Sequence, residues 1–522
     1  MSVSDSQVRE GCSGLERIHR GMWMELRLRD QDVAEFVQSA TAGRRILAFG
    51  VGDGEHVRAL LRGQSDVTLT VWDRDPWLLR LFLDAQPLGE EFVSGRLSLA
   101  LTTDIIELAC DPDITAWAHP VACVQYAHEW EIMKARGLGS HAPLAMVAEG
   151  ELFVDDLADA LSAEGYRVFP LDAALHAVEE LALQVTHAQA ALVASINYKE
   201  GLAEFCAAHG LPLISWEIDP TTDRMAPLEA PDHQARLFTY RRAQVAEFQA
   251  AGFSHVEYLP LASNPGRRLP SSPNSDDAAR YGVPVAFVGA SLQDQVATHR
   301  AALLRIVEQT AERRDDAVGL ERRLSAVLDA QARDYSRYLI PELFEAHWGD
   351  LKISAGGSGE NAVQLVGEIA AANKRTAYLA ALGSRGVHVW GDDGFADLAG
   401  TGAVWRGLAG HYHELNKIYS YARINVDIGR LYQQDIVTMR VFDVLACGGF
   451  VIAEWSEALA ELFDVGREVE AYRTLEELVA KIDHYSAHRN ETGEIAERGR
   501  YRVLRDHTIR ARVRRMLDSL EA

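Results

Sequence analysis

Short apolar runs alternate with amphipathic segments along the first part of the chain. RRILAFGVGDGEHVRALL (44–61) has the pattern of an apolar strand, a glycine-rich turn and a helix with one apolar face. The same strand-then-helix pattern follows at 68–85 and at 96–109. This βαβαβ order predicts a doubly wound parallel sheet, and therefore a Rossmann-like domain over residues 41–142. Residues 1–40 are predicted to be a helical lead-in to that domain.

The alternation starts again near residue 143. The pattern predicts a helix at 154–165 and apolar strands at 191–198 and 211–219. Further strand-and-helix alternation continues to about residue 265. We therefore predict a second α/β domain over residues 143–265.

A segment rich in proline, serine and asparagine follows, and we predict a linker over residues 266–283. Directly after it, PVAFVGAS (284–291) predicts a buried strand. Residues 294–348 are predicted to be a helical insertion, and residues 475–521 a helical tail. Together with the short strands between them, these segments predict a third α/β domain over residues 284–522. Rossmann-like domains on both sides of a hinge indicate a ligand held between them.

Composition and charge remove several classes of function. The chain has 522 residues, of which 48% are hydrophobic and 25% are charged, as in ordinary globular proteins. The formal net charge of −24 argues against a surface that tracks nucleic-acid phosphates or an anionic membrane. No apolar run is long enough for a membrane span and the N-terminus is polar, so we predict a cytoplasmic protein. The five cysteines are scattered without a C-x-x-C pair, which predicts neither a disulfide framework nor a zinc site.

The glycine-rich turn near the front is a candidate nucleotide site. Gly50, Gly52 and Gly54 follow a strand and open a helix, and Asp73 ends the next strand. This arrangement resembles the nucleotide-binding half of S-adenosylmethionine methyltransferases, and the segment also resembles the N-terminal domain of motility-associated-factor (Maf) proteins, which are linked to flagellin glycosylation. The alternative is that the glycines serve only the tight turn. No recognisable methyl-transfer motif follows, and we favour this alternative.

The densest chemical signal lies in DIVTMRVFDVLACGGFVIAEW (435–455). Arg440 and the glycines at 448 and 449 could hold a diphosphate at a helix and turn. A carboxylate nearby, Asp435 or Asp443, could accept the hydroxyls of a ribose. These are the groups needed to hold a nucleotide-sugar. The alternative is a surface helix of mixed charge.

The same segment resembles the C-terminal domain of GT-B glycosyltransferases of the CgeB-like (spore-maturation protein) group. Their pattern R-x-F-E-x-x-A-x-G-G-F, followed by E-L-F-x-x-G-x-E, is matched here except that Asp443 stands in place of Glu. The matching residues are Arg440, Phe442, Ala446, Gly448, Gly449, Phe450, Glu461, Leu462, Phe463, Gly466 and Glu468. The resemblance extends over about 143–515. It implies a GT-B-like pair of Rossmann-like domains, with the N-terminal Rossmann-like domain as an addition.

The resemblance also implies a function. We expect a metal-independent glycosyltransferase without a required cofactor, whose donor is a nucleotide-sugar, probably a UDP-sugar. The acceptor would be a protein, possibly flagellin, or a cell-surface glycan. Gly289 and Gly391, at strand ends of the last domain, would line the donor site, and Glu217 or Asp219 would be the general base. The alternatives are a methyltransferase or bifunctional enzyme that uses the front domain, and a non-catalytic scaffold.

Overall fold

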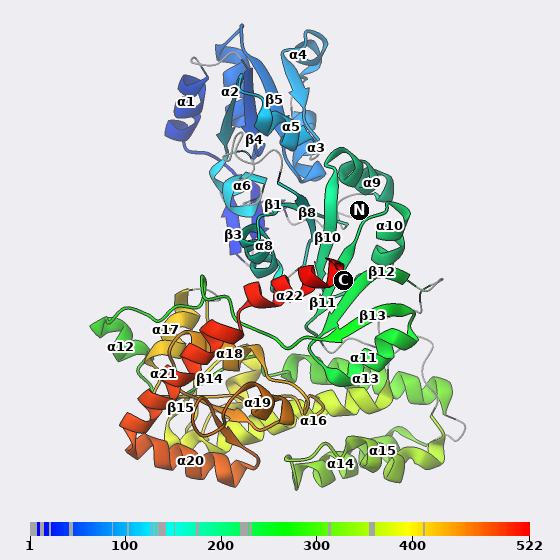
Figure 1. Cartoon of the computed structure of the whole chain (residues 1–522), viewed down its shortest axis with the longest axis vertical. Coiled ribbons are helices and arrows are strands. Elements are labelled where there is room, and N and C mark those ends of the chain that lie inside the picture. The colour runs from blue at the N-terminus through cyan, green and yellow to red at the C-terminus, as the bar shows by residue number, and fades with distance from the viewer. Residues whose placement is uncertain are drawn as a thin grey trace. The chain divides into compact units, whose positions relative to one another are not determined.

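The computed structural model divides the chain into two compact units, Met1–Ser215 and Trp216–Ala522 (Figure 1). The predicted boundary at 143 and the single domain over 143–265 stay predictions. The residues that the structure describes are 8–10, 15–19, 22–40, 45–85, 87–101, 104–126, 129–130, 133, 142–150, 152–173, 177–219, 228, 232–311, 315–353, 361–410 and 413–521.

The first unit contains a four-stranded parallel sheet in the order β6-β5-β4-β7. Numbered along the chain this order is 3-2-1-4, as in one half of a Rossmann fold. Its strands are β4 (Arg45–Phe49), β5 (Thr68–Trp72), β6 (Leu97–Leu99) and β7 (Ile114–Ala118). The helices around them are α1 (Asp30–Ser39), α2 (Glu55–Gly63), α3 (Pro76–Ala85), α4 (Gly89–Val93), α5 (Asp104–Cys110) and α6 (Pro120–Gln125).

Three more parallel strands of the first unit are β8 (Leu144–Ala148), β9 (Arg167–Leu171) and β10 (Ala190–Ile196), with β8 in the middle. The helices beside them are α8 (Val154–Ala163), α9 (Val178–His187) and α10 (Leu202–Ala208). The boundary between the compact units falls within β11 (Leu213–Glu217). On the second unit's side, β12 (Asp232–Thr239) pairs in parallel with β13 (Phe253–Tyr258), and α11 (Arg242–Ala250) joins them.

The main sheet of the second unit has six parallel strands in the order β16-β15-β14-β17-β18-β19. Counted along the chain this is 3-2-1-4-5-6, the strand order of a complete Rossmann fold, and the order reverses between β14 and β17. The strands are β14 (Val285–Val288), β15 (Val387–Trp390), β16 (Val404–Trp405), β17 (Ile424–Val426), β18 (Val451–Glu454) and β19 (Glu470–Tyr472). The predicted α/β class with Rossmann-like parallel sheets is confirmed.

Helices cover this sheet and form a second core beside it. Apolar side chains of α13 to α16 pack against one another in one buried cluster, which explains the long helical insertion. These helices are α13 (Gln293–Thr310), α14 (Ala317–Ala332), α15 (Ile340–Trp348) and α16 (Ala362–Ala381). The others are α17 (His413–Tyr421), α18 (Met439–Ala446), α19 (Glu457–Leu462), α20 (Leu475–Ala487), α21 (Arg489–Asp506) and α22 (Ile509–Glu521). Within the described part of the chain, no helix combines the length and apolarity of a membrane span.

One local prediction was wrong. In place of a helical lead-in, residues 1–40 contain three antiparallel strands before α1: β1 (Val8–Glu10), β2 (Leu15–His19) and β3 (Met22–Glu25). Glycines at 11, 14 and 21 divide this sequence into pieces too short for helices, since glycine is a poor helix former. The predicted linker also contains a helix, α12 (Ser275–Tyr281), because the Asn274 side chain accepts the N–H groups of Asp276 and Asp277 and caps it.

Candidate functional site

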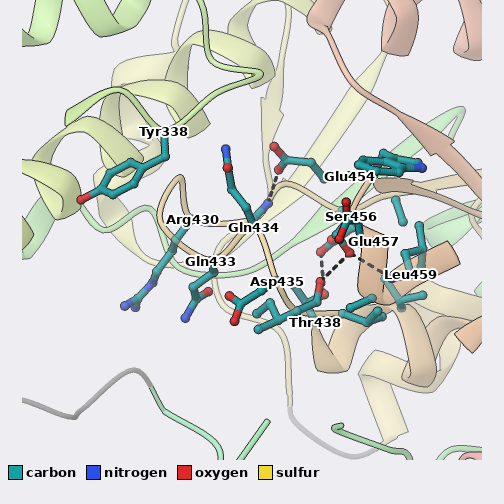
Figure 2. Close-up of a pocket in the computed structure, with 18 of the residues that line it drawn as sticks. Tyr338, Arg430, Gln433, Gln434, Asp435, Thr438, Glu454, Ser456, Glu457 and Leu459 are labelled. Atoms are coloured by element: carbon teal, nitrogen blue, oxygen red, sulfur yellow. Dashed lines mark hydrogen bonds between the residues drawn. The ribbon is translucent and has the colours of Figure 1, made fainter. Parts of the chain in front are cut away.

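A cavity of about 630 Å³ lies at the carboxyl ends of β17 and β18 in the second unit. It lies beside the point where the strand order reverses, which is where open α/β sheets commonly bind ligands. Figure 2 shows Arg430, Gln433 and Asp435 on one side of the view, and Glu454, Ser456 and Glu457 on the other. The charged residues that line it are Arg242, Arg337, Arg430, Arg473, Asp427, Asp435, Glu454, Glu457 and Glu461. This nearly balanced, hydrogen-bonding lining suits a polar ligand.

The loop that follows β17 forms one wall of the cavity, and separate side chains hold each of its residues. Arg440 forms an ion pair with the Asp427 carboxylate. The Gly429 N–H donates to the Glu454 carboxylate at 3.0 Å. The buried ammonium of Lys374 donates to the other oxygen of the same carboxylate. The next residue, Arg430, donates to Glu368 at 3.0 Å. The wall is therefore fixed by its own protein contacts, as a preorganised binding surface requires.

Two arginines occupy the reversal point of the sheet. Arg440 Nε donates to the Val288 carbonyl at the end of β14, at 2.6 Å, while its ion pair holds the loop after β17. Arg375 from α16 donates to the carbonyls of Ala290 and Ile428. Burial, together with the nearby positive charge of Arg440, lowers the pKa of Arg375 to about 9. These side chains hold together the two loops at the reversal point.

The loop after β12 holds several residues that line the cavity. Arg241 donates to Asp435 Oδ1 at 3.2 Å and to the Tyr432 carbonyl at 3.1 Å. The Gln433 amide donates to the Tyr240 hydroxyl at 2.9 Å. The other carboxylate oxygen, Asp435 Oδ2, is buried and has no hydrogen-bond partner among the described residues.

The glycines predicted at the donor site, Gly289 and Gly391, lie at the ends of β14 and β15, where the backbones pack tightly. A Cβ on Gly391 would lie 2.2 Å from the Gly289 carbonyl oxygen, so only glycine fits there. The Gly289 N–H donates to Trp390, and the Gly391 N–H donates to Gly407. The Ser291 N–H is bound by Asp392 at 2.7 Å. These amides are therefore occupied by protein groups, in contrast to the expected diphosphate contact.

Three other predicted residues lie on or after α18. Asp443 is buried, with its two oxygens bound by Ser263 Oγ at 2.7 Å and Arg268 Nε at 2.8 Å. Gly448 and Gly449 end the helix, and their N–H groups donate to carbonyls of that helix. Eight residues of helix place them about 12 Å from the helix start, where Thr438 lines the cavity. None of the three lines this cavity, and the ribose and diphosphate contacts expected of them stay predictions.

The candidate bases lie at the end of β11. Glu217 is the last residue of the strand and is buried, with 3% of its surface exposed. Asp219 lies beyond the strand and is half-buried, so strand alternation does not fix the direction of its carboxylate relative to that of Glu217. Burial raises the pKa of the Tyr240 hydroxyl, and the negative charge of Asp219 adds to this effect. Tyr240 accepts a hydrogen bond from Gln433, which lines the cavity.

In the first unit, neighbouring side chains of the protein occupy the space around the glycine-rich turn. Gly50, Gly52 and Gly54 all have positive φ. A Cβ on Gly50 would lie 2.2 Å from Ala122 Cβ, and one on Gly52 would lie 2.6 Å from His119 Nε2. These two glycines therefore serve close packing beneath α6 and its N-cap histidine.

Asp73, the predicted ribose acceptor, is buried beside this turn. Its oxygens accept the Val51 N–H at 2.9 Å and the Tyr126 hydroxyl at 2.8 Å. The carboxylate therefore stabilises the turn. This supports the prediction that the glycines serve the backbone geometry.

We expect calorimetry with S-adenosylmethionine to show no binding to the full chain. Asp73→Ala should instead reduce stability by about 1–3 kcal/mol, because it leaves the Val51 N–H and the Tyr126 hydroxyl without their acceptor. Thermal melting checks this, with Asp84→Ala as the control, since Asp84 is 68% exposed and pairs only at the surface. Micromolar S-adenosylmethionine binding that Asp73→Ala abolishes would contradict this expectation.

The sequence interpretation missed several cavity-forming residues. Asp427 and Arg430 stand in the segment INVDIGR, and a carboxylate directly after a buried strand was a usable signal. Glu368, Lys374 and Arg375 stand in α16, a largely buried helix. Charged residues on such a helix are a signal, because buried charges need partners.

Comparisons with known proteins give a family match for the C-terminal part of the chain. Residues 370–518, less than half of the chain, match the family model described as glycosyl transferase-like. This agrees with the predicted enzyme class. No curated protein matches the chain in sequence.

Solved structures of low identity also match. The HepE protein of Anabaena, solved in complex with UDP and glucose, is 11% identical, with a TM-score of 0.44, and covers 73% of this chain and 100% of its own. A glycosyltransferase from Rickettsia africae is 10% identical, with a TM-score of 0.42, over 73% of this chain and 98% of its own. Sucrose-phosphate synthase from Thermosynechococcus elongatus is 12% identical, with a TM-score of 0.41, over the same two shares.

Proposed function

We propose that this chain transfers a sugar from a nucleotide-sugar to an acceptor hydroxyl, and that the cavity at the ends of β17 and β18 binds the donor. The observation that carries this proposal is the cavity's place, at the carboxyl edge of a Rossmann-ordered sheet and beside its reversal point. Most of the lining lies within 370–518, the segment that matches the glycosyl transferase-like model. The exceptions are Arg242, Ser336, Arg337 and Tyr338.

The cavity offers chemistry for both parts of such a donor. Carboxylates accept hydrogen bonds from sugar hydroxyls, and Asp435 lines the cavity with its side chain 30% exposed. Guanidinium groups bind phosphates, and Arg473 is an exposed cavity residue that stacks on Trp455, with its Cζ 3.3 Å from the ring centre. In this proposal the arginines that line the cavity stabilise the negative charge that develops on the diphosphate leaving group.

The identity of the donor, the acceptor, the residues that contact the donor, the metal requirement and the location are proposals as well. A UDP-sugar is the first donor to test, and the acceptor is a protein, such as flagellin, or a cell-surface glycan. Direct contact of the donor with Gly289, Gly391 or Asp435 is retained as a proposal, and Asp435 has the best support because it lines the cavity. For Arg440 we propose a structural role first, because its ion pair with Asp427 and its hydrogen bond to Val288 are with protein groups, and direct donor contact is the alternative. A requirement for no metal and a cytoplasmic location also remain proposals.

We expect UDP or a UDP-sugar to raise the melting temperature of the chain. A ligand that binds only the folded state at 100 times its Kd adds about 2.7 kcal/mol of stability. Arg473→Ala should weaken this binding about 10-fold or more, because a charge-assisted hydrogen bond contributes about 1.5–3 kcal/mol. Thermal shift and calorimetry measure both effects.

Arg467→Ala is the matched control, since Arg467 is 73% exposed and does not line the cavity. If millimolar UDP, GDP and dTDP compounds all leave the melting curve unchanged, the donor assignment is wrong. If a nucleotide binds but Arg473→Ala and Arg467→Ala bind it equally well, the donor lies outside this cavity.

A further inference from the structure

Two histidines and a glutamate converge where α20 ends and α21 begins. His484, His488 and Glu491 each offer a ligand atom, and these atoms all lie within 4.8 Å of one another. His484 Nε2 lies 3.1 Å from Glu491 Oε2. The two imidazole rings are stacked, with their centres 4.1 Å apart. None of the three residues lines the cavity described above, so this cluster is a separate feature.

A backbone contact orients one of the two imidazoles. His488 Nδ1 lies 2.7 Å from the His484 carbonyl oxygen. A carbonyl can only accept, so Nδ1 of His488 carries the proton and Nε2 carries the lone pair. Histidines that bind metals commonly donate their second ring nitrogen to a carbonyl in this way, which fixes the ring orientation. The imidazole lone pair lies in the plane of its ring, so the stacked rings of His484 and His488 must turn before both can bind one ion, and both side chains are exposed and have room to do so.

The spacing of the ligands also suits a tetrahedral ion. Zinc bonds of about 2.0–2.2 Å place neighbouring tetrahedral ligands roughly 3.4 Å apart. His484 Nε2 and Glu491 Oε2 are 3.1 Å apart, which is a hydrogen-bond distance, so an ion bound between them would replace the proton that they share. Two imidazoles and a carboxylate favour borderline divalent ions such as Zn²⁺, whereas Mg²⁺ and Ca²⁺ prefer sites built from oxygen atoms.

We propose that His484, His488 and Glu491 form a binding site for a divalent transition-metal ion of the Zn²⁺ class. The three protein ligands leave a fourth tetrahedral position for water or for a group from another molecule. The ligands come from the end of α20, its cap residue and the first turn of α21. A bound ion would therefore tie together α20 and α21, the first two helices of the C-terminal tail (Figure 1).

The test uses the full chain without an affinity tag, under reducing conditions, with Co²⁺ as the spectroscopic probe and Zn²⁺ in calorimetry. We expect one Co²⁺ ion with the strong visible absorption of tetrahedral coordination, and its displacement by Zn²⁺. His484→Ala and His488→Ala should each lower Zn²⁺ affinity at least tenfold, and Glu491→Gln should lower it as well. His255→Ala, which removes another exposed histidine of the second unit, should leave the affinity unchanged.

Circular dichroism of the metal-free variants separates loss of a ligand from loss of the fold. Zn²⁺ affinity equal to the wild type in both folded histidine variants would overturn the proposal. So would the absence of Co²⁺ and Zn²⁺ binding to the wild-type chain, or saturation of the same site by Mg²⁺. None of these outcomes depends on the donor site or on transferase activity.

Discussion

Arg440→Ala is expected to destabilise the second unit by about 3–5 kcal/mol and to abolish donor binding with it. The Asp427 carboxylate is only 4% exposed, and removing its ion-pair partner leaves a buried charge with reduced compensation. The Val288 carbonyl also loses its donor, and the Phe287 ring loses the cation above it. Urea unfolding followed by fluorescence measures the loss. The variant would thus affect the fold first, whereas an exposed phosphate ligand would affect binding alone.

A double replacement tests whether the buried, unpaired charge of Asp427 causes this loss of stability. Combining Arg440→Met with Asp427→Leu removes both charges, so it should recover part of the stability that either single replacement loses. Arg467→Ala, an arginine-to-alanine change at an exposed ion pair, should change stability by about 0.5 kcal/mol or less. If Arg440→Ala folds as stably as the wild type and only donor binding is lost, Arg440 is a direct donor ligand and the structural role is wrong.

The second large effect is expected at the end of β11. If a carboxylate there is the general base, its replacement by the amide should lower the rate about 10²–10⁴-fold while nucleotide affinity stays within a few-fold. We expect Asp219→Asn to show this loss and Glu217→Gln to show less. Asp219 is half-buried and influences Tyr240, whereas Glu217 is almost fully buried. Transfer assays with a labelled UDP-sugar, together with calorimetry for UDP, provide both readouts.

Glu497→Gln is the matched control for these carboxylates, because Glu497 is exposed on α21 and outside the cavity. An equal loss of UDP affinity in Asp219→Asn would mean that this carboxylate shapes the donor site instead. Full transfer activity in both variants would place the base elsewhere in the chain.

The parallel sheets could be predicted from the sequence because their signal is local. The side chains of apolar runs such as VAFVG and TLTVW are buried under helices on the faces of the sheet, so a few consecutive apolar residues suffice to indicate a strand. The prediction of a helical lead-in over residues 1–40 was wrong because the local signal there is weak. Segments of three to five residues are too short to show a period clearly.

The candidate site could be predicted less well because it is made by distant partners. Arg440 and Asp443 were recognised from one continuous motif, but their surroundings come from elsewhere in the chain. Asp443 is neutralised by Arg268, 175 residues earlier, and Arg375 reaches the Ile428 carbonyl across 53 residues. A motif indicates which residues matter, whereas the partner decides whether a carboxylate meets a ligand or anchors a helix.

The fixed loop after β17 has a consequence for how binding free energy is distributed. A wall already held by Arg440, Lys374 and Glu454 has little conformational freedom left to lose when a ligand arrives. Its ordering entropy was lost during folding, so more of each new contact can appear as affinity. The same arrangement makes the positions interdependent. A substitution at one holding residue changes what is tolerated at the others, so sequence drift around this cavity should proceed by coupled changes.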